Sequence, residues 1–114
     1  MNTLSPSGDE LIGILAALAS PIRLRIIESL SSGRDYVSNL AREIGVSRPL
    51  LHMHLQRLEA VGLITGTLEL SEDGKAMKYY EVTGFALHLT AATLADAAKT
   101  LTKSDPELGS LPKE

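Results

Sequence analysis

Residues 38–63, SNLAREIGVSRPLLHMHLQRLEAVGL, decide the fold of this 114-residue chain. Two short helical patterns are separated here by a glycine-containing turn, and Ser47 stands directly before the second pattern as its N-cap. Leu51, Leu55 and Leu58 recur at spacings of four and three residues, so they form one stripe of the second helix. The stripe predicts a helix, residues 47–61, that packs on a core by its leucine side and leaves the opposite side open.

The open side of this helix carries the side chains that recognition of the DNA major groove requires. Arg48 can make a bidentate contact to guanine, Gln56 can pair with adenine, and His52 can donate to a base or a phosphate. Two apolar neighbours, Leu50 and Met53, can contact a thymine methyl group. An ordinary solvated helix face has the same composition, because single contacts of this kind are not specific. The candidate DNA-reading residues of this helix are Ser47, Arg48, Pro49, Leu50, His52, Met53, Gln56 and Arg57.

The net charge is −3, which excludes a protein that coats nucleic acid through bulk positive charge. The charge is unevenly distributed, because residues 34–57 hold four arginines against two acids. Residues 68–82 instead hold Lys75 and Lys78 against four acids. We expect Arg42, Lys75 and Lys78 to contact the DNA backbone. The alternative for residues 68–82 is a solubilising hairpin that does not touch DNA.

Helical patterns also flank the central stretch. Ser7 or Asp9 can cap a first helix, Ser20 followed by Pro21 starts a second, and Ser38 is expected to cap the third. On this basis residues 1–7 form a loose arm, residues 8–102 form one domain with helices at both ends, and residues 103–114 form a disordered tail.

From residue 63 the pattern changes from helical to alternating, and Asp73 followed by Gly74 is a strong turn signal. A two-stranded antiparallel hairpin with these residues at the turn centre is the predicted structure. It would pair Leu68 with Tyr79, Glu69 with Lys78 and Leu70 with Met77. A last helix is expected from Phe85 to Leu101, because leucine and alanine recur there at spacings of four and three residues.

The expected order is four helices, a hairpin and a last helix, a mainly α structure with a small β-hairpin (α+β) of the winged helix-turn-helix type. The chain resembles the ArsR family of dimeric repressors in three segments. These are LASPIRLRIIESL (18–30), LAREIGVSRPLLHMHLQRLEAVGLI (40–64) and GKAMKYYEV (74–82). The resemblance implies a homodimer on a two-fold related operator, with Arg48, His52 and Met53 at reading positions. It does not specify an effector, which can be a small molecule or a protein.

The terminal helices contain more apolar side chains than one small domain can bury, and the resemblance implies that they pair in the dimer. The predicted dimer interface consists of Leu11, Ile12, Leu15, Leu18, Leu87, Ala91, Leu94, Ala98 and Leu101. A second function class fits the same sequence, a winged-helix module that binds protein and not DNA. Its support is the acidic hairpin and the apolar residues on the open face of helix 47–61.

The sequence contains no cysteine, so a thiolate metal site and a cysteine nucleophile are excluded. His52 and His54 lie about 200° apart around a helix and cannot share an ion, and His54 is expected to pack in the core. His88 has only Asp96 as a companion ligand. We therefore expect no metal and no cofactor. No serine-histidine-acid set and no phosphate-binding loop is recognisable, so an enzyme is not expected.

The apolar run at residues 11–19 raises the question of a signal peptide. Asp9 and Glu10 precede it without any lysine or arginine, the reverse of a signal sequence, and nine residues are too few to cross a bilayer. We therefore expect a cytoplasmic protein with no membrane partner.

Overall fold

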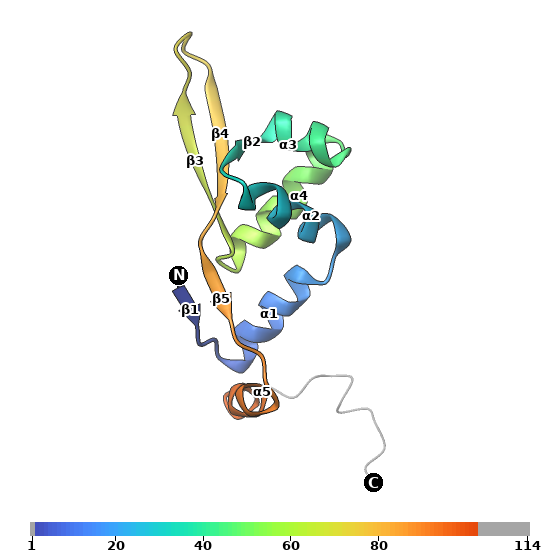
Figure 1. Ribbon diagram of the computed structural model, residues 1–114, viewed down its shortest axis with the longest axis vertical. Helices are drawn as coiled ribbons and strands as arrows, with labels where there is room; N and C mark the ends of the chain where they lie inside the picture. Colours follow the sequence, from blue (N-terminus) through green and yellow to red (C-terminus); the bar gives the residue numbers. More distant parts are fainter. Residues whose placement is uncertain (1, 103–114) are drawn as a thin grey trace.

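Helices α2, α3 and α4 lie at the centre of the molecule, with the β3–β4 hairpin projecting at one end and α5 at the other (Figure 1). The computed structural model describes residues 2–102, so the predicted tail at 103–114 lies outside the described residues. The helices are α1 (Gly8–Leu18), α2 (Pro21–Ser31), α3 (Val37–Ile44), α4 (Arg48–Ala60) and α5 (Ala91–Ala98). The strands are β1 (Asn2–Leu4), β2 (Asp35–Tyr36), β3 (Ile64–Leu70), β4 (Ala76–Val82) and β5 (Phe85–Leu87).

The turn between α3 and α4 forms as the sequence predicts. Gly45 adopts a left-handed conformation with φ 82°, and its N–H donates to the carbonyl of Ala41 at 2.8 Å. The Ser47 hydroxyl then accepts from the N–H of Leu50 at 3.2 Å, which starts α4. Ser38, in contrast, is not a cap, because α3 already begins at Val37 and its N-cap residue has no side-chain hydrogen bond.

The core confirms the leucine stripe of α4. Leu51, Leu55 and Leu58 are 0% exposed. Their neighbours in the core come from every element around α4, namely Ile14, Ala17, Ile26, Leu30, Leu40, Ala41, Leu63, Ile64 and Tyr80. Burying each leucine contributes about 1.5–3 kcal/mol, so the rotation of α4 about its own axis is strongly determined.

The β3–β4 hairpin is antiparallel as expected, but its register differs from the predicted one by one residue. Leu68 pairs with Lys78 and not with Tyr79, and Glu69 pairs with Met77 and not with Lys78. Leu70 likewise pairs with Ala76. A shift of one residue exchanges the partners across the hairpin, so Leu68 and Lys78 lie on one face of the hairpin and Glu69 on the other.

The turn explains the shift. Its loop has three residues and not two, because Ser71 and Lys75 close the hairpin with a 2.8 Å hydrogen bond from Ser71 N–H to the Lys75 carbonyl. Gly74, at φ 84°, occupies the left-handed position that ends such a loop, and its N–H donates to the Ser71 carbonyl at 2.9 Å. The Ser71 hydroxyl also accepts from Lys75 N–H at 3.0 Å, so a serine before the turn favours the longer loop.

Two expectations about the ends of the domain are wrong. Residues 2–4, predicted as a loose arm, form β1, which pairs in parallel with β5. Residues 85–87, predicted as the start of the last helix, form β5. The last helix begins only after Thr90, whose hydroxyl accepts from the N–H of Thr93 at 3.1 Å in a capping box. The sequence pattern did not indicate this cap, because leucine and alanine keep a helical spacing on both sides of it.

The two terminal helices meet at Gly8, the first residue of α1. Its N–H donates to the Thr100 hydroxyl at 2.7 Å, and a Cβ at this position would lie 2.5 Å from the carbonyl oxygen of Ala97. A side chain therefore cannot be added here without moving α5 away from α1. Within residues 2–102, none of the helices combines the length and apolar composition that crossing a bilayer requires.

Arg23 of α2 joins the end of α1 to the middle of α4, a role that the sequence does not indicate. Its guanidinium donates to the carbonyls of Ala16 and Ala17 in the last turn of α1. It also donates from Nη1 to Nδ1 of His54 at 2.9 Å. Because an arginine can only donate, Nδ1 is the acceptor and His54 is the neutral tautomer with its proton on Nε2.

His54 is 8% exposed, as expected of a packed histidine. Burial lowers the pKa of His54 below its ordinary value of 6.5, and the neighbouring charges of Arg23 and Arg57 lower it further. The neutral form is therefore favoured at neutral pH, and it supports the hydrogen bond from Arg23.

We expect Gly8→Ala to lower the free energy of unfolding by about 1–3 kcal/mol, because its Cβ would collide with backbone. Gly13→Ala is the matched control within the same helix. Its Cβ would meet only Val61 Cγ1 at 3.6 Å, so alanine should stabilise the protein by about 0.5–1 kcal/mol. Urea unfolding followed by circular dichroism measures the free energy of unfolding of both variants. Equal effects of the two substitutions would contradict the close packing of α1 on α5.

We also expect the free energy of unfolding to fall as pH decreases below 6.5. In the window between the lowered pKa of folded His54 and 6.5, the unfolded chain binds the proton and the folded chain does not, so stability rises with pH. His54→Asn keeps an acceptor for Arg23 but removes the titrating group. Urea unfolding between pH 5 and pH 8 should therefore show a weaker pH dependence for the variant, and an unchanged one would refute the assignment.

Candidate nucleic-acid interface

The side of α4 that faces away from the core forms a continuous exposed surface. Every predicted reading residue of this helix is exposed: Ser47, Arg48, Pro49, Leu50, His52, Met53, Gln56 and Arg57. The two apolar members, Leu50 and Met53, are 38% and 43% exposed and thus available for contact. The structure therefore brings together on one surface the donors and apolar groups that the sequence analysis singled out.

The positive charges on this surface are not neutralised. Within residues 2–102, ion pairs join only Arg34 to Glu69 and Lys99 to Asp96. Arg48 at the start of α4 and Arg57 near its end therefore keep their charge for a partner. Arg42, in the last turn of α3, is also exposed and donates to the side-chain oxygen of Asn39 at 2.9 Å. Two arginines thus lie on the open face of α4, and a third lies in the last turn of the preceding helix.

Arg34 has a different role from the other arginines. Its guanidinium pairs with Glu69 of β3 and lies 4.3 Å from the centroid of the Tyr79 ring. The hydrogen bond to Glu69 raises the pKa of Arg34, and the same bond lowers the pKa of Glu69. Tyr36 meets the same Tyr79 ring edge-on at 5.9 Å. This cluster attaches the hairpin to the segment before α3 and pairs one positive with one negative charge at the surface.

The two lysines of the hairpin occupy different places. Lys75 is exposed in the turn, where Asp73 is also charged, because the hydrogen bond from the Ser71 hydroxyl lowers the pKa of Asp73. Lys78 lies on the face that it shares with exposed Leu68, and its Nζ is 5.6 Å from the centroid of the Tyr80 ring. Lys78 is therefore nearer to the body of the domain than the acidic turn.

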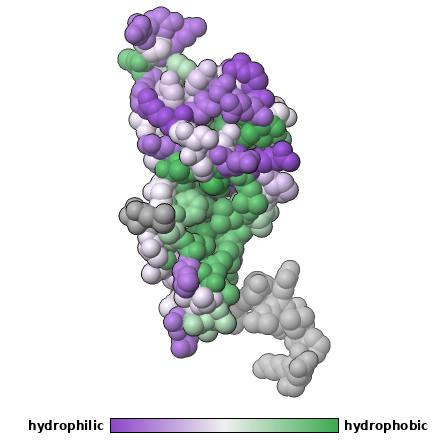
Figure 2. Space-filling model, viewed as in Figure 1, coloured by the Kyte–Doolittle hydropathy of each residue, from purple (hydrophilic) through white to green (hydrophobic). Residues whose placement is uncertain are grey.

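The predicted dimer residues divide into two groups. Leu11 is buried within its own protomer, and Leu18 and Leu87 are half-buried. The other six are exposed, with Ile12 at 58% and Leu15 at 37%: Ile12, Leu15, Ala91, Leu94, Ala98 and Leu101. Hydrophobic residues gather over the part of the molecule that contains α1, whereas the hairpin end is mostly hydrophilic (Figure 2).

Metal-ligating side chains do not cluster in the part of the chain that the structure describes. No group of three His, Asp or Glu residues that could hold an ion occurs there. His88 and Asp96 line one cleft of about 410 Å³ between β1, β5 and α5, and its walls are largely leucine, alanine and threonine.

Comparison with known proteins agrees with this geometry. The family model for bacterial regulatory proteins of the arsR family matches residues 20–65, which include α2, α3, α4 and the intervening turns. An uncharacterized HTH-type transcriptional regulator of Methanocaldococcus jannaschii is 33% identical over 73 residues, or 64% of this chain and 76% of that protein. The transcriptional repressor SmtB of Mycobacterium tuberculosis is 29% identical over 86 residues, or 75% of this chain and 61% of that protein.

Solved structures share the fold. A homodimeric winged helix-turn-helix DNA-binding domain from Mycobacterium bovis has a TM-score of 0.60 and 28% identity, and the match covers 67% of this chain and 66% of that one. NolR from Sinorhizobium fredii has a TM-score of 0.55 and 25% identity, covering 80% of each chain. This chain therefore belongs to the ArsR family of winged helix-turn-helix transcriptional regulators.

Proposed function

We propose that this regulator is a homodimeric repressor that binds a two-fold related operator and reads each half-site with the open face of α4. The observation that carries the proposal is the division of α4 into a fully buried leucine side and an exposed side whose arginines form no ion pair within residues 2–102. A helix held rigidly by its core side can enter a major groove with its outer side. Arg48 is placed at the N-terminal end, where recognition helices contact base edges.

The hairpin has a secondary role in this proposal. Its turn carries Glu72 and Asp73, which repel phosphates, so Lys78 and Lys75 supply at most two backbone contacts. Glu69 does not add to the repulsion, because Arg34 neutralises it. Recognition therefore depends mainly on α4, and the hairpin contributes sequence-independent affinity.

Dimerisation in this proposal uses the exposed apolar face of α1 together with α5. Ile12 and Leu15 share one face of α1, and Leu94 and Leu101 are exposed on and directly after α5. Because α1 and α5 pack on each other at Gly8, we expect these residues to form one surface. Pairing two such surfaces would place two α4 helices on successive turns of one face of the duplex.

The direct test is fluorescence anisotropy with a labelled duplex from the region upstream of the gene. We expect salt-sensitive binding by the dimer that an unlabelled specific duplex displaces and a scrambled duplex does not. Absence of sequence-dependent binding would refute the proposal. It would favour the alternative of a winged-helix module that binds another protein.

We expect Arg48→Ala to weaken the free energy of binding to the specific duplex by about 1–3 kcal/mol, because it removes a bidentate donor. The variant should also discriminate less between specific and scrambled duplexes. Lys78→Ala should weaken specific and scrambled duplexes equally and reduce the salt slope by about 1. Lys99→Ala, at the opposite end of the molecule, is the control and should leave affinity unchanged. Equal losses on specific and scrambled duplexes for Arg48→Ala would contradict base reading by Arg48.

We expect Leu15→Glu to convert the dimer to a monomer, because burying an unpaired carboxylate in an apolar interface is unfavourable. Sedimentation velocity at micromolar concentration measures the change, and operator affinity should fall with it. Leu24→Glu places the same charge at a leucine on α2 that is 54% exposed, and this variant should remain dimeric. A dimeric Leu15→Glu variant would exclude this face as the interface.

A further inference from the structure

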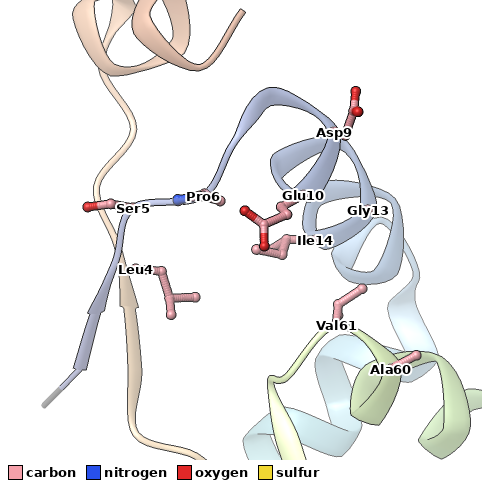
Figure 3. Close-up of a pocket in the computed structure, with 9 residues that line it drawn as sticks. All are labelled: Leu4, Ser5, Pro6, Asp9, Glu10, Gly13, Ile14, Ala60 and Val61. Atoms are coloured by element: carbon pink, nitrogen blue, oxygen red, sulfur yellow. The ribbon is translucent and has the colours of Figure 1, made fainter. Parts of the chain in front are cut away.

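A cleft of about 540 Å³ lies between the segment that joins β1 to α1 and the C-terminal end of α4 (Figure 3). Its volume falls within the range of roughly 300–1,000 Å³ that is usual for small-molecule sites. The cleft meets the open face of α4 only at Ala60, beyond the predicted reading residues, none of which lines it. It also lies on a different side of α1 from Ile12 and Leu15, because Glu10, Gly13 and Ile14 are rotated away from those residues around the helix.

Three elements supply the apolar walls of the cleft. Leu4 comes from β1, Ile14 from α1 and Val61 from the residue that follows α4. Their side chains lie around the same space (Figure 3). A ligand in this space would therefore contact the N-terminal strand, the predicted dimerisation helix and the end of the reading helix at once.

Gly13 keeps one side of the cleft open. It lies in the interior of α1, where glycine costs about 0.5–1 kcal/mol relative to alanine. Its backbone conformation does not require glycine, because its φ is not positive. Packing does not require it either, since an added Cβ would find its nearest neighbour, Val61 Cγ1, at 3.6 Å. Glycine at position 13 therefore leaves space in the cleft that a side chain would occupy.

Two carboxylates line the cleft, and one of them, the solvent-exposed Glu10, points into it. Figure 3 shows the side chain of Glu10 directed towards Ile14, whereas that of Asp9 points outward. Asp9 also accepts from the hydroxyl of Thr102. Glu10 uses Oε1 to accept from the N–H of Ser7 at 2.9 Å, and Oε2 has no hydrogen-bond partner among residues 2–102. The bonds with the backbone and side chain of Ser7 lower the pKa of Glu10, so the carboxylate is charged at neutral pH.

The end of α4 adds a second source of negative potential. Ala60 is the last residue of α4 and Val61 its C-cap, and both line the cleft. The C-terminal end of a helix carries a partial negative charge from its unpaired carbonyl groups, which favours cations. The first turn of α1 also lines the cleft and carries the opposite partial charge, but Asp9 and Glu10 in that turn offset it. The two carboxylates and the end of α4 therefore favour a cation.

We propose that this cleft binds a small organic cation whose apolar body lies against Leu4, Ile14 and Val61 and whose ammonium group pairs with the free carboxylate oxygen of Glu10. Such a ligand would tie the start of α1 to the end of α4. If the proposed function is correct, occupancy changes the position of α4 relative to the dimer face and hence the affinity for operator DNA.

The test uses the full-length chain and n-hexylammonium as the probe, with n-hexanoate of equal length as the anionic control. We expect saturable amide shifts in two-dimensional NMR spectra, centred on residues 10–14 and 60–61, with a dissociation constant on the order of 1 mM. Hexanoate should not produce these shifts. Probe-induced shifts elsewhere alone, no saturation, or equal binding of hexanoate would overturn the proposal.

Two substitutions test the two parts of the site. Glu10→Gln retains the capping box, since glutamine is equally suited to it, but removes the charge, and should weaken binding of the probe by about fivefold. Gly13→Leu should fill the cleft and abolish binding, with circular dichroism as the check on folding. Glu28→Gln, an exposed glutamate of α2 outside the cleft, should bind the probe normally. Unchanged binding by Glu10→Gln, or equal weakening by Glu28→Gln, would refute the role of Glu10.

Operator binding is measured separately, with and without the probe. Binding of the probe without any effect on operator affinity would retain the site and refute the coupling to α4. Absence of operator binding in the unliganded protein would refute the proposed function and leave the ligand site standing. The two proposals can therefore fail independently.

Discussion

The rest of the structure depends on burial of the leucine stripe of α4. Leu51, Leu55 and Leu58 are completely enclosed by side chains from α1, α2, α3 and the hairpin. Three buried leucines can be satisfied in only one rotation of the helix, so the same constraint that builds the core also decides which residues face outward. The exposed surface that we propose reads DNA is therefore oriented by core packing alone.

A second interaction sets the position of α4 relative to the N-terminal helix. Arg23 lies between two carbonyls in the last turn of α1 and the neutral imidazole of His54, and thus connects α1 to α4. Arg23 is half-buried, and its Nε, Nη1 and Nη2 atoms each donate to a different acceptor, which fixes the direction of this connection. The cleft at Glu10 and Val61 lies between the same two helices, at the start of α1 and the end of α4. One set of hydrogen bonds and one cleft thus lie between α1 and α4.

The surface charges are distributed unevenly, so the net charge does not describe the surface around α4. The chain is acidic overall, yet the arginines next to the open face of α4 are unpaired within residues 2–102. Arg34 is the exception, because it neutralises Glu69 and packs on Tyr79. This ion pair attaches the hairpin to the segment before α3, and it leaves one positive and one negative charge partly compensated at the surface.

The sequence alone determined the helix-turn-helix, the hairpin and the exposed residues of α4, because caps, glycine turns and leucine spacing are local signals that act within a few residues. Tertiary structure decided what depends on distant partners. The β1–β5 pair joins residues 2–4 to residues 85–87, Arg34 meets Glu69, and Arg23 meets His54. No local pattern encodes such contacts, since each needs the whole chain folded before the two partners come within hydrogen-bonding distance. The hairpin register depends on both kinds of signal. Ser71 is close to the turn in sequence, but its hydrogen bonds to Lys75 select the three-residue loop only once the turn has closed.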